Sequence, residues 1–270
     1  MRWKKRMYVA IRRELREHKS SFYVYMVLRI LTILTLISQA IQGNWETVFL
    51  AALALVMLII PSVLQVTLKI ELPTVLEIIV LLFIFAAQIL GEIKGFYVIF
   101  PFWDDVLHTL NGFLAAAIGF SLVDVLNKSE KLTFTLSPLF TVLVGFCFSM
   151  TIGAVWEIFE FSMDMIGGFD MQKDTVVSSV SSVMLDPTGG NTPTAIPNIQ
   201  EVYVDGVALG LGGYLDIGII DTMFDLIVNF LGALIFSVIA YVHIKTSGMG
   251  NVISKFVLRR KKKEEDYLEN

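Results

Sequence analysis

Cysteine and histidine are both scarce in this sequence of 270 residues. Its single cysteine, Cys147, lies within an apolar run, so no disulfide can form within the chain. Only three histidines occur, and only His108 falls in the body of an apolar segment. A four-helix di-iron site needs two Glu-x-x-His motifs, so this supply of imidazoles argues against one. The Gly-x-Ser-x-Gly motif of serine hydrolases is also missing.

Charged residues are few as well, at 17% of the chain against 55% hydrophobic residues. The mean hydropathy is +0.70. A soluble domain cannot bury so much apolar surface, and the long apolar runs predict transmembrane helices. Arg29 is the one base inside such a run, where we interpret it as a snorkelling or pairing residue. A phosphatase site built on Arg and Lys is therefore disfavoured, and we expect membrane lipids, not nucleic acid, as partners.

The apolar runs predict an all-α, polytopic integral membrane protein with six transmembrane helices, each near the ~20 residues that span a bilayer. The expected spans are Phe22–Ile41, Val48–Leu68, Pro73–Leu90, Asp105–Leu126, Pro138–Met163 and Ile219–Ile244. The expected organisation is a basic arm (1–21), five spans (22–164), an outer loop (165–218), the sixth span (219–244) and a tail (245–270).

Basic residues predict the orientation of these helices. Eight Lys and Arg lie between residues 2 and 19, and seven lie between residues 245 and 263. Because Lys and Arg favour the cytoplasmic side, both termini should be cytoplasmic, which requires an even number of spans. Lys128 and Lys131 fall in an inner loop by this rule, whereas the outer loops carry only Lys94 and Lys173. We expect a multi-pass protein of the bacterial plasma (inner) membrane.

Three of the apolar segments carry a short series of ionisable groups near one end. Charge within a membrane helix costs roughly 2.5–3.5 kcal/mol per residue on insertion scales, so such groups usually face the protein interior and serve a function. The three series are Asp104, Asp105 and His108; Glu157, Glu160 and Asp164; and Asp221, Asp225 and Asn229. With the orientation above, all three fall in the outer third of the membrane.

Spacings of three, four, seven and eight residues place each series on one face of its helix. Small residues, which let transmembrane helices approach closely, lie beside them. They are Gly112, Gly153, Ala154, Gly232 and Ala233. The simplest packing turns the three polar faces toward one another and forms one outward-facing site.

Carboxylates this close cannot all stay ionised unless a cation lies among them. One interpretation is a divalent metal site: carboxylates with an imidazole suit Zn²⁺, Mn²⁺ or Fe²⁺, and carboxylates with amides suit Ca²⁺, Mg²⁺ or Mn²⁺. A second is a set of carboxyls that share protons. A third is a structural hydrogen-bond network between helices.

Three stretches resemble the YjdF-like bacterial inner-membrane proteins, a family of unknown function. They are Gly95 to His108, which ends Phe-Trp-Asp-Asp-Val-Leu-His, then Trp156-Glu-Ile-Phe-Glu, and Asp221-Thr-Met-Phe-Asp. The likeness spans roughly residues 72–241 and implies family positions at Asp104, His108, Glu157, Glu160, Asp221 and Asp225. A looser likeness to VanZ-like membrane proteins rests on Asp225, Asn229 and Gly232. The resemblance implies a membrane fold and no particular activity.

The leading functional hypothesis is a metal-binding hydrolase or transferase that acts on a lipid or envelope precursor. A bound metal would polarise a water, with Glu157 or Glu160 as the acid or base. The alternatives are a small cation or proton transporter or channel subunit, and a non-enzymatic membrane scaffold. The substrate and the oligomeric state do not follow from the sequence.

Overall fold

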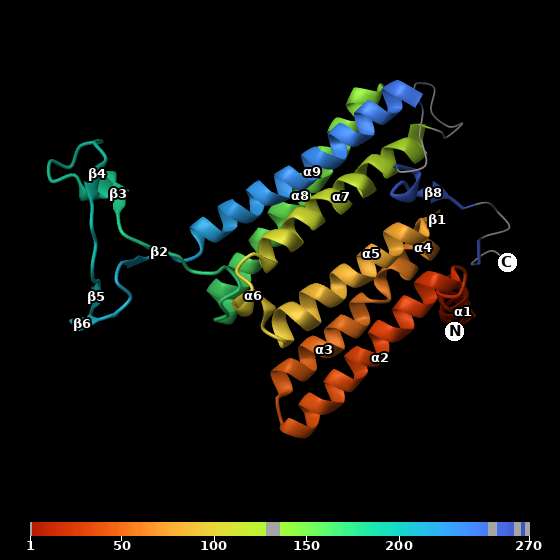
Figure 1. Ribbon diagram of the computed structural model, residues 1–270, viewed down its shortest axis with the longest axis horizontal. Helices are drawn as coiled ribbons and strands as arrows, with labels where there is room; N and C mark the ends of the chain where they lie inside the picture. The colour runs from red at the N-terminus through yellow and green to blue at the C-terminus, as the bar shows by residue number, and fades with distance from the viewer. Residues whose placement is uncertain (1, 128–135, 248–252, 262–265, 268–270) are drawn as a thin grey trace. The chain divides into compact units, whose positions relative to one another are not determined.

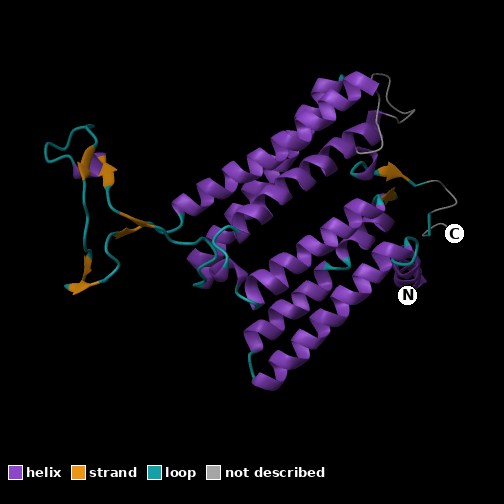
Figure 2. Cartoon of the chain, viewed as in Figure 1, coloured by secondary structure: helices purple, strands orange, loops and turns teal. Residues whose placement is uncertain are grey.

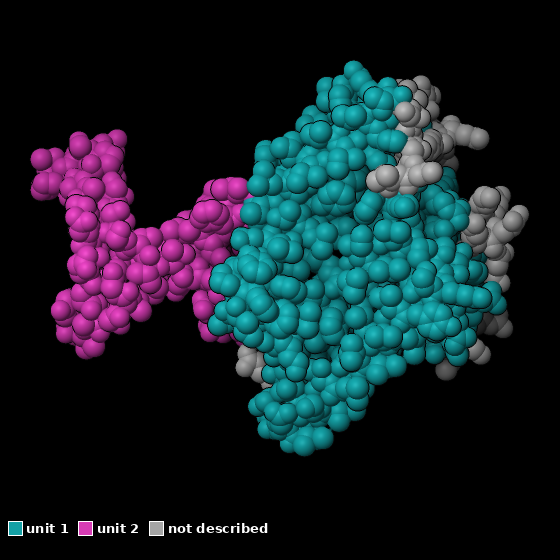
Figure 3. All heavy atoms as spheres, viewed as in Figure 1, with its two compact units in different colours: residues 1–153, 228–270 teal, residues 154–227 magenta. Residues whose placement is uncertain are grey.

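The computed structural model describes residues 2–127, 136–247, 253–261 and 266–267 (Figure 1). Two compact units divide the chain: residues 1–153 with 228–270 form unit 1, and residues 154–227 form unit 2 (Figure 3). Of the basic residues used to predict the orientation, Lys128, Lys131, Lys262 and Lys263 lie outside the described residues.

The expectation of six transmembrane helices is confirmed. Within the described chain, six helical segments are long and apolar enough to cross a membrane (Figure 2). They are Lys19–Gln42, Thr47–Leu68, Thr74–Ile93, Trp103–Asn127, Pro138–Gly167 and Ile219–Thr246.

The helices of unit 1 follow the predicted spans, with two irregularities. In order, the elements up to the fourth span are α1 Arg2–Glu14, α2 Lys19–Gln42, α3 Trp45–Met57, α4 Ile60–Leu68, β1 Ile70–Glu71, α5 Thr74–Phe85, the π-helix η1 Ala86–Ile93, α6 Phe96–Ile99 and α7 Trp103–Asn127. The second span is broken between α3 and α4 because Pro61 has no N–H to donate to the carbonyl of Met57. The third span ends in the π-helix, which widens its last turns.

Two residues with positive φ end the first two spans. Gly43, at φ 78°, follows α2, and its N–H donates to the Ala40 carbonyl at 3.2 Å. Lys69, at φ 54°, follows α4. A left-handed residue at this position turns the chain out of the helix and satisfies a carbonyl that would otherwise lack a donor.

Three longer helices form the second half of the bundle. They are α7, α8 Pro138–Ser162 and α9 Ile219–Ser247, and both α8 and α9 continue from unit 1 into unit 2. A buried cluster in unit 1 joins them; its members include Ala116 and Phe120 on α7, Val142 on α8, and Ala233 and Phe236 on α9. A second cluster packs α2, α3 and α5 together.

The N-terminal helix and the C-terminal segment meet at one end of unit 1. After η4 Ile253–Lys255, strand β8 Arg259–Arg260 pairs antiparallel with β1. Lys261 Nζ contacts Glu14 at the end of α1 and lies 3.5 Å from Glu17 Oε2. Both terminal segments therefore lie at the same end of unit 1, as an even number of spans requires.

Unit 2 contains the last residues of α8, the first residues of α9 and the long connection between them. After the π-helix η2 Met163–Gly167, the connection has three short antiparallel strand pairs. They are β2 Val176–Val177 with β7 Tyr214–Leu215, β3 Val180–Ser182 with β4 Thr194–Ile196, and β5 Tyr203–Val204 with β6 Val207–Ala208; the short helix η3 spans Val183–Leu185.

Candidate metal centre

Three glycines bring α7, α8 and α9 into close contact within unit 1. A Cβ added at Gly112 would lie 2.0 Å from the Asn229 carbonyl oxygen, and one at Gly232 would lie 1.9 Å from that of Thr109. A Cβ at Gly153 would lie 2.8 Å from Asn229 Nδ2. Only glycine permits backbones this close, as the small residues beside the polar faces predicted.

Asn229 is fully buried where these helices meet. Its side-chain oxygen accepts from Asn111 Nδ2 at 3.1 Å, and its Nδ2 lies 3.5 Å from the Ser149 carbonyl. Ser149 in turn donates to the Gly112 carbonyl at 2.8 Å. Asn229, expected among the metal ligands, thus joins three helices by hydrogen bonds, which is the structural role of polar groups between transmembrane helices.

His108 lies one turn from Gly112 on α7 and is 7% exposed. Its Nε2 is 3.5 Å from Asp104 Oδ1, one turn away, and Asp104 is half-buried. A carboxylate beside one ring nitrogen fixes the orientation of the imidazole and makes it a better ligand. The pairing agrees with the i,i+4 spacing seen in the sequence.

In unit 2, α8 and α9 bring three buried carboxyls together. Glu157 and Glu160 on α8 and Asp225 on α9 are 5%, 8% and 2% exposed. One carboxylate oxygen of each lies within 4.8 Å of those of the other two. Asp221, one turn from Asp225, has an oxygen within the same distance of it. Glu157 and Glu160 are i,i+3, so both face α9.

Two predicted ligands, Asp164 and Asp221, hold the connection between α8 and α9. The carboxylate of Asp164, in η2, accepts the N–H of Met171 at 2.6 Å and that of Gln172 at 2.9 Å. Asp221 accepts the N–H of Lys173 at 2.7 Å. The Gln172 side chain, itself buried, donates to Thr222 on α9. These contacts fasten the first residues of the loop to η2 and to the start of α9.

Among the described residues, neither Asp105 nor Asp164 belongs to a group of potential metal ligands. Asp105 is half-buried on α7, beside Asp104. The spacing that placed these acids on the polar faces was correct, but spacing alone could not separate the carboxyls that converge from those that cap a turn.

In unit 2, the side chains that could hold a metal ion by both type and burial are Glu157, Glu160 and Asp225, and His108 of unit 1 is an imidazole of similar burial. Carboxylate oxygens with one imidazole nitrogen are a donor set that suits Mn²⁺, Fe²⁺ or Zn²⁺. The residues therefore fit a divalent cation.

The sequence analysis did not predict a second set of buried polar residues in unit 1. They lie at the ends of the spans opposite to His108. Glu77 on α5 is 5% exposed and accepts from Gln65 Nε2 at 3.2 Å, and Gln65 is 1% exposed. Glu71 on β1, also buried, pairs with Arg259 and lies 3.4 Å from His18 Nε2. Glu77 lies near the start of a predicted span and Glu71 just before it, and the tertiary packing buries them both.

Comparison with known proteins gives one match. The family model described as "Predicted membrane protein (DUF2238)" matches residues 23–246. This match covers all six spans and agrees with the resemblance to YjdF-like membrane proteins, whereas the VanZ likeness stays a prediction. No curated protein and no solved structure matches the chain.

Proposed function

This chain belongs to the DUF2238 family of predicted membrane proteins, and we propose that it is a divalent-metal-binding hydrolase or transferase of the bacterial plasma membrane. The observation that carries the proposal is the group of three buried carboxyls, Glu157, Glu160 and Asp225. Three like charges in a low dielectric repel one another strongly, and a bound cation removes that cost.

Helix geometry supports His108 as the fourth ligand. Gly112 on α7 and Gly153 on α8 both meet Asn229 on α9. His108, Glu157 and Asp225 each lie four residues from these three positions, and on each helix that is one turn in the outward direction. Because residues four apart share a helix face, each of the three side chains lies on the face of its own helix that takes part in the contact at Asn229.

In the proposed reaction, a bound divalent cation would supply Lewis acidity and lower the pKa of a coordinated water. Glu157 or Glu160 would accept the proton of the attacking water or alcohol and return a proton to the leaving group. Asp104 would hold the His108 ring in place. The outward position of the site suits a lipid or envelope precursor as the substrate.

Metal analysis of the purified protein tests the proposed site. We expect about one divalent metal ion per chain in the wild type. Asp104→Asn, which acts through His108, should weaken metal binding by ~10- to 100-fold, and Asp225→Asn, which removes a direct ligand, should weaken it more. Asp186→Asn, which removes a loop carboxylate outside the group, is the matched control. Equal metal content in wild type and Asp225→Asn would refute the metal site.

Mass spectrometry of envelope lipids tests the chemical step. Cells with Glu157→Gln or Glu160→Gln in place of the wild type should accumulate the unconverted lipid, while Asp186→Asn cells should not. Retained metal with no lipid change in either glutamine variant would separate metal binding from catalysis and remove the enzymatic claim.

The buried acids of unit 1 favour a second candidate, a proton or cation transporter. Glu77 is buried near the start of the third span, and Glu71 is buried in the short strand just before it. Buried ionisable groups within membrane spans often mark ion pathways. Proteoliposomes that carry the protein should then show a pH-driven flux that Glu77→Gln abolishes; identical traces for empty and loaded vesicles would eliminate this candidate.

A further inference from the structure

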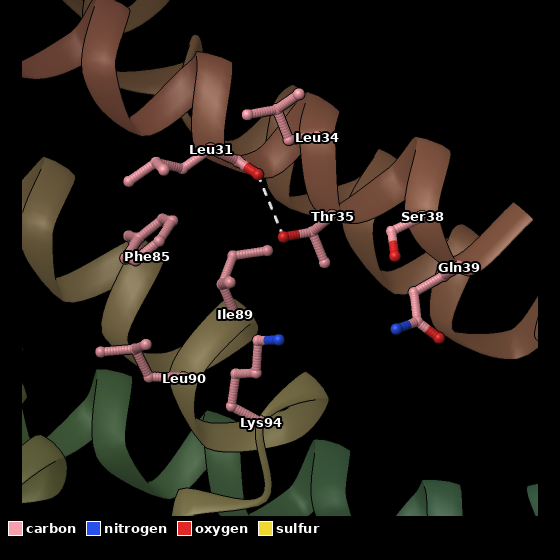
Figure 4. Close-up of a pocket in the computed structure, with 9 residues that line it drawn as sticks. All are labelled: Leu31, Leu34, Thr35, Ser38, Gln39, Phe85, Ile89, Leu90 and Lys94. Carbon is pink, nitrogen blue, oxygen red and sulfur yellow. Dashed lines mark hydrogen bonds between the residues drawn. The ribbon is translucent and has the colours of Figure 1, made fainter.

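A groove on unit 1, between α2 and the end of the third span, shares no residue with the candidate metal centre. Its volume is about 320 Å³. It is lined by Leu31, Leu34, Thr35, Ser38 and Gln39 of α2, by Phe85, Ile89 and Leu90 of the third span, and by Lys94 just beyond it. Figure 4 shows the Lys94 side chain reaching from its own helix toward α2.

The lining changes in polarity along the groove. Its deeper part is hydrocarbon, from Leu31, Leu34 and Phe85, and its other end carries Ser38, Gln39 and Lys94. Lys94 directly follows the third span and Gln39 lies in the last turn of α2. The polar end of the groove therefore falls where two membrane spans end, at the level of lipid headgroups.

The polar groups at this end are donors. Ser38 Oγ already accepts from Gln42 Nε2 at 3.1 Å, and Gln39 Oε1 accepts from Asn44 Nδ2 at 2.8 Å. These bonds leave the Ser38 hydroxyl hydrogen and the Gln39 amide hydrogens for a ligand. Together with the exposed Lys94 ammonium, they suit a phosphate group.

The length of the groove suits an acyl chain. From Leu31 to Gln39 the groove follows α2 for ~12 Å, from the apolar part of the span to its polar end.

We propose that this groove binds one anionic phospholipid. Its acyl chains lie against Leu31, Leu34 and Ile89, and its phosphate accepts hydrogen bonds from Lys94, Ser38 and Gln39. An anionic headgroup is preferred over a zwitterionic one because it offers Lys94 no competing ammonium. The site does not depend on the proposed metal centre, since the two share no residue.

Native mass spectrometry of the purified full-length protein, titrated with phosphatidylglycerol or phosphatidylcholine, tests the proposal. We expect one site with roughly fivefold to tenfold preference for phosphatidylglycerol, the contribution of one lysine near a lipid headgroup. Lys94→Gln should abolish the preference. Lys173→Gln removes the other lysine predicted on the outer side, which is not among the residues that line the groove, and should preserve the preference.

A second pair of variants tests the hydrocarbon part of the groove. Leu34→Trp fills it and should weaken binding of both lipids at least fivefold. Ile30→Trp, one turn away on the exposed side of α2 and outside the lining, should leave binding unchanged.

Two results would overturn the proposal. One is equal lipid preference in Lys94→Gln and Lys173→Gln, which decides the question even if Leu34→Trp fails to fold. The other is a protein dimer that either groove variant dissociates, because the groove would then hold a second copy of the chain.

Discussion

At the scale of single residues, Glu14 is a buried acid outside the membrane spans. It is 5% exposed at the end of α1 and contacts Lys261, with Glu17 close by. Burial raises the pKa of Glu14 to about 7, although Lys261 opposes the shift. Its ordinary value is 4.5, so the folded protein holds a proton here that the unfolded chain releases at lower pH.

The stability of the protein should therefore depend on pH through Glu14. The favourable contribution is fully present below pH ~4.5 and is lost as the pH rises toward ~7, with a total of at most about 3 kcal/mol. The melting temperature in detergent should fall across this pH range in the wild type, and it should fall less in Glu14→Gln. Glu201→Gln, a loop acid, serves as the control; an unchanged slope in Glu14→Gln would contradict the assignment.

At the scale of elements, the contact between α7 and α9 depends on glycine. Gly112 and Gly232 lie against backbone carbonyls of the facing helix, and Asn229 fixes the contact with hydrogen bonds. A helix backbone is rigid and moves as one body. One added methyl group at this contact therefore displaces the whole facing helix.

Gly112→Ala should destabilise the protein by about 1–3 kcal/mol, the usual cost of overpacking. His108 lies one turn from Gly112 on the same helix, so the displacement should also move its imidazole. The metal content of the variant should therefore fall along with its stability. Ala52→Val adds bulk to an exposed position of α3 and should have little effect. Denaturant unfolding compares the two; similar stabilities would show that the helices tolerate separation.

At the scale of the whole molecule, unit 1 is closed by contacts between segments far apart in sequence. Within the segment 258–261, strand β8 pairs with β1, and Lys261 contacts Glu14 of α1. The Leu258 N–H donates a hydrogen bond to Ser121 Oγ on α7 at 3.0 Å. This C-terminal segment thus fastens the N-terminal helix to α7.

Lys261→Met should weaken the contact between the C-terminal segment and α1. Removal of one partner of a buried ion pair leaves the other charge uncompensated, and we expect a loss of about 2–4 kcal/mol at pH 8. The loss should shrink near pH 5.5, where Glu14 takes up a proton. Unfolding at both pH values, with the exposed Lys255→Met as control, checks this; a pH-independent loss would point to packing alone.

The predicted orientation is also testable at this scale, because Cys147 is the only cysteine. In a Cys147→Ser background, Met184→Cys in the loop should react with a membrane-impermeant maleimide on intact cells. Tyr8→Cys, on α1, should react only after lysis. Both positions are well exposed, so the reverse pattern would invert the topology.

Much of the site was foreseeable from local pattern. The i,i+3 and i,i+4 spacings placed Glu157 with Glu160, and Asp104 with His108, on shared helix faces. They could not show that Asp164 caps a turn at Met171, because that depends on where α8 changes to a π-helix. Nor could they show the break at Pro61, since a proline near the start of a helix and one within it look alike in an apolar run.

The sequence by itself determined the six spans, because the hydrophobic length needed to cross a bilayer is a property of consecutive residues. It also determined which faces of α7, α8 and α9 are polar. Only the tertiary structure decided which carboxyls meet, which ones cap the loop, and that Glu14, Glu71 and Glu77 are buried. Those outcomes depend on how each helix is rotated against its neighbours and on partners distant in sequence, which local periodicity does not encode.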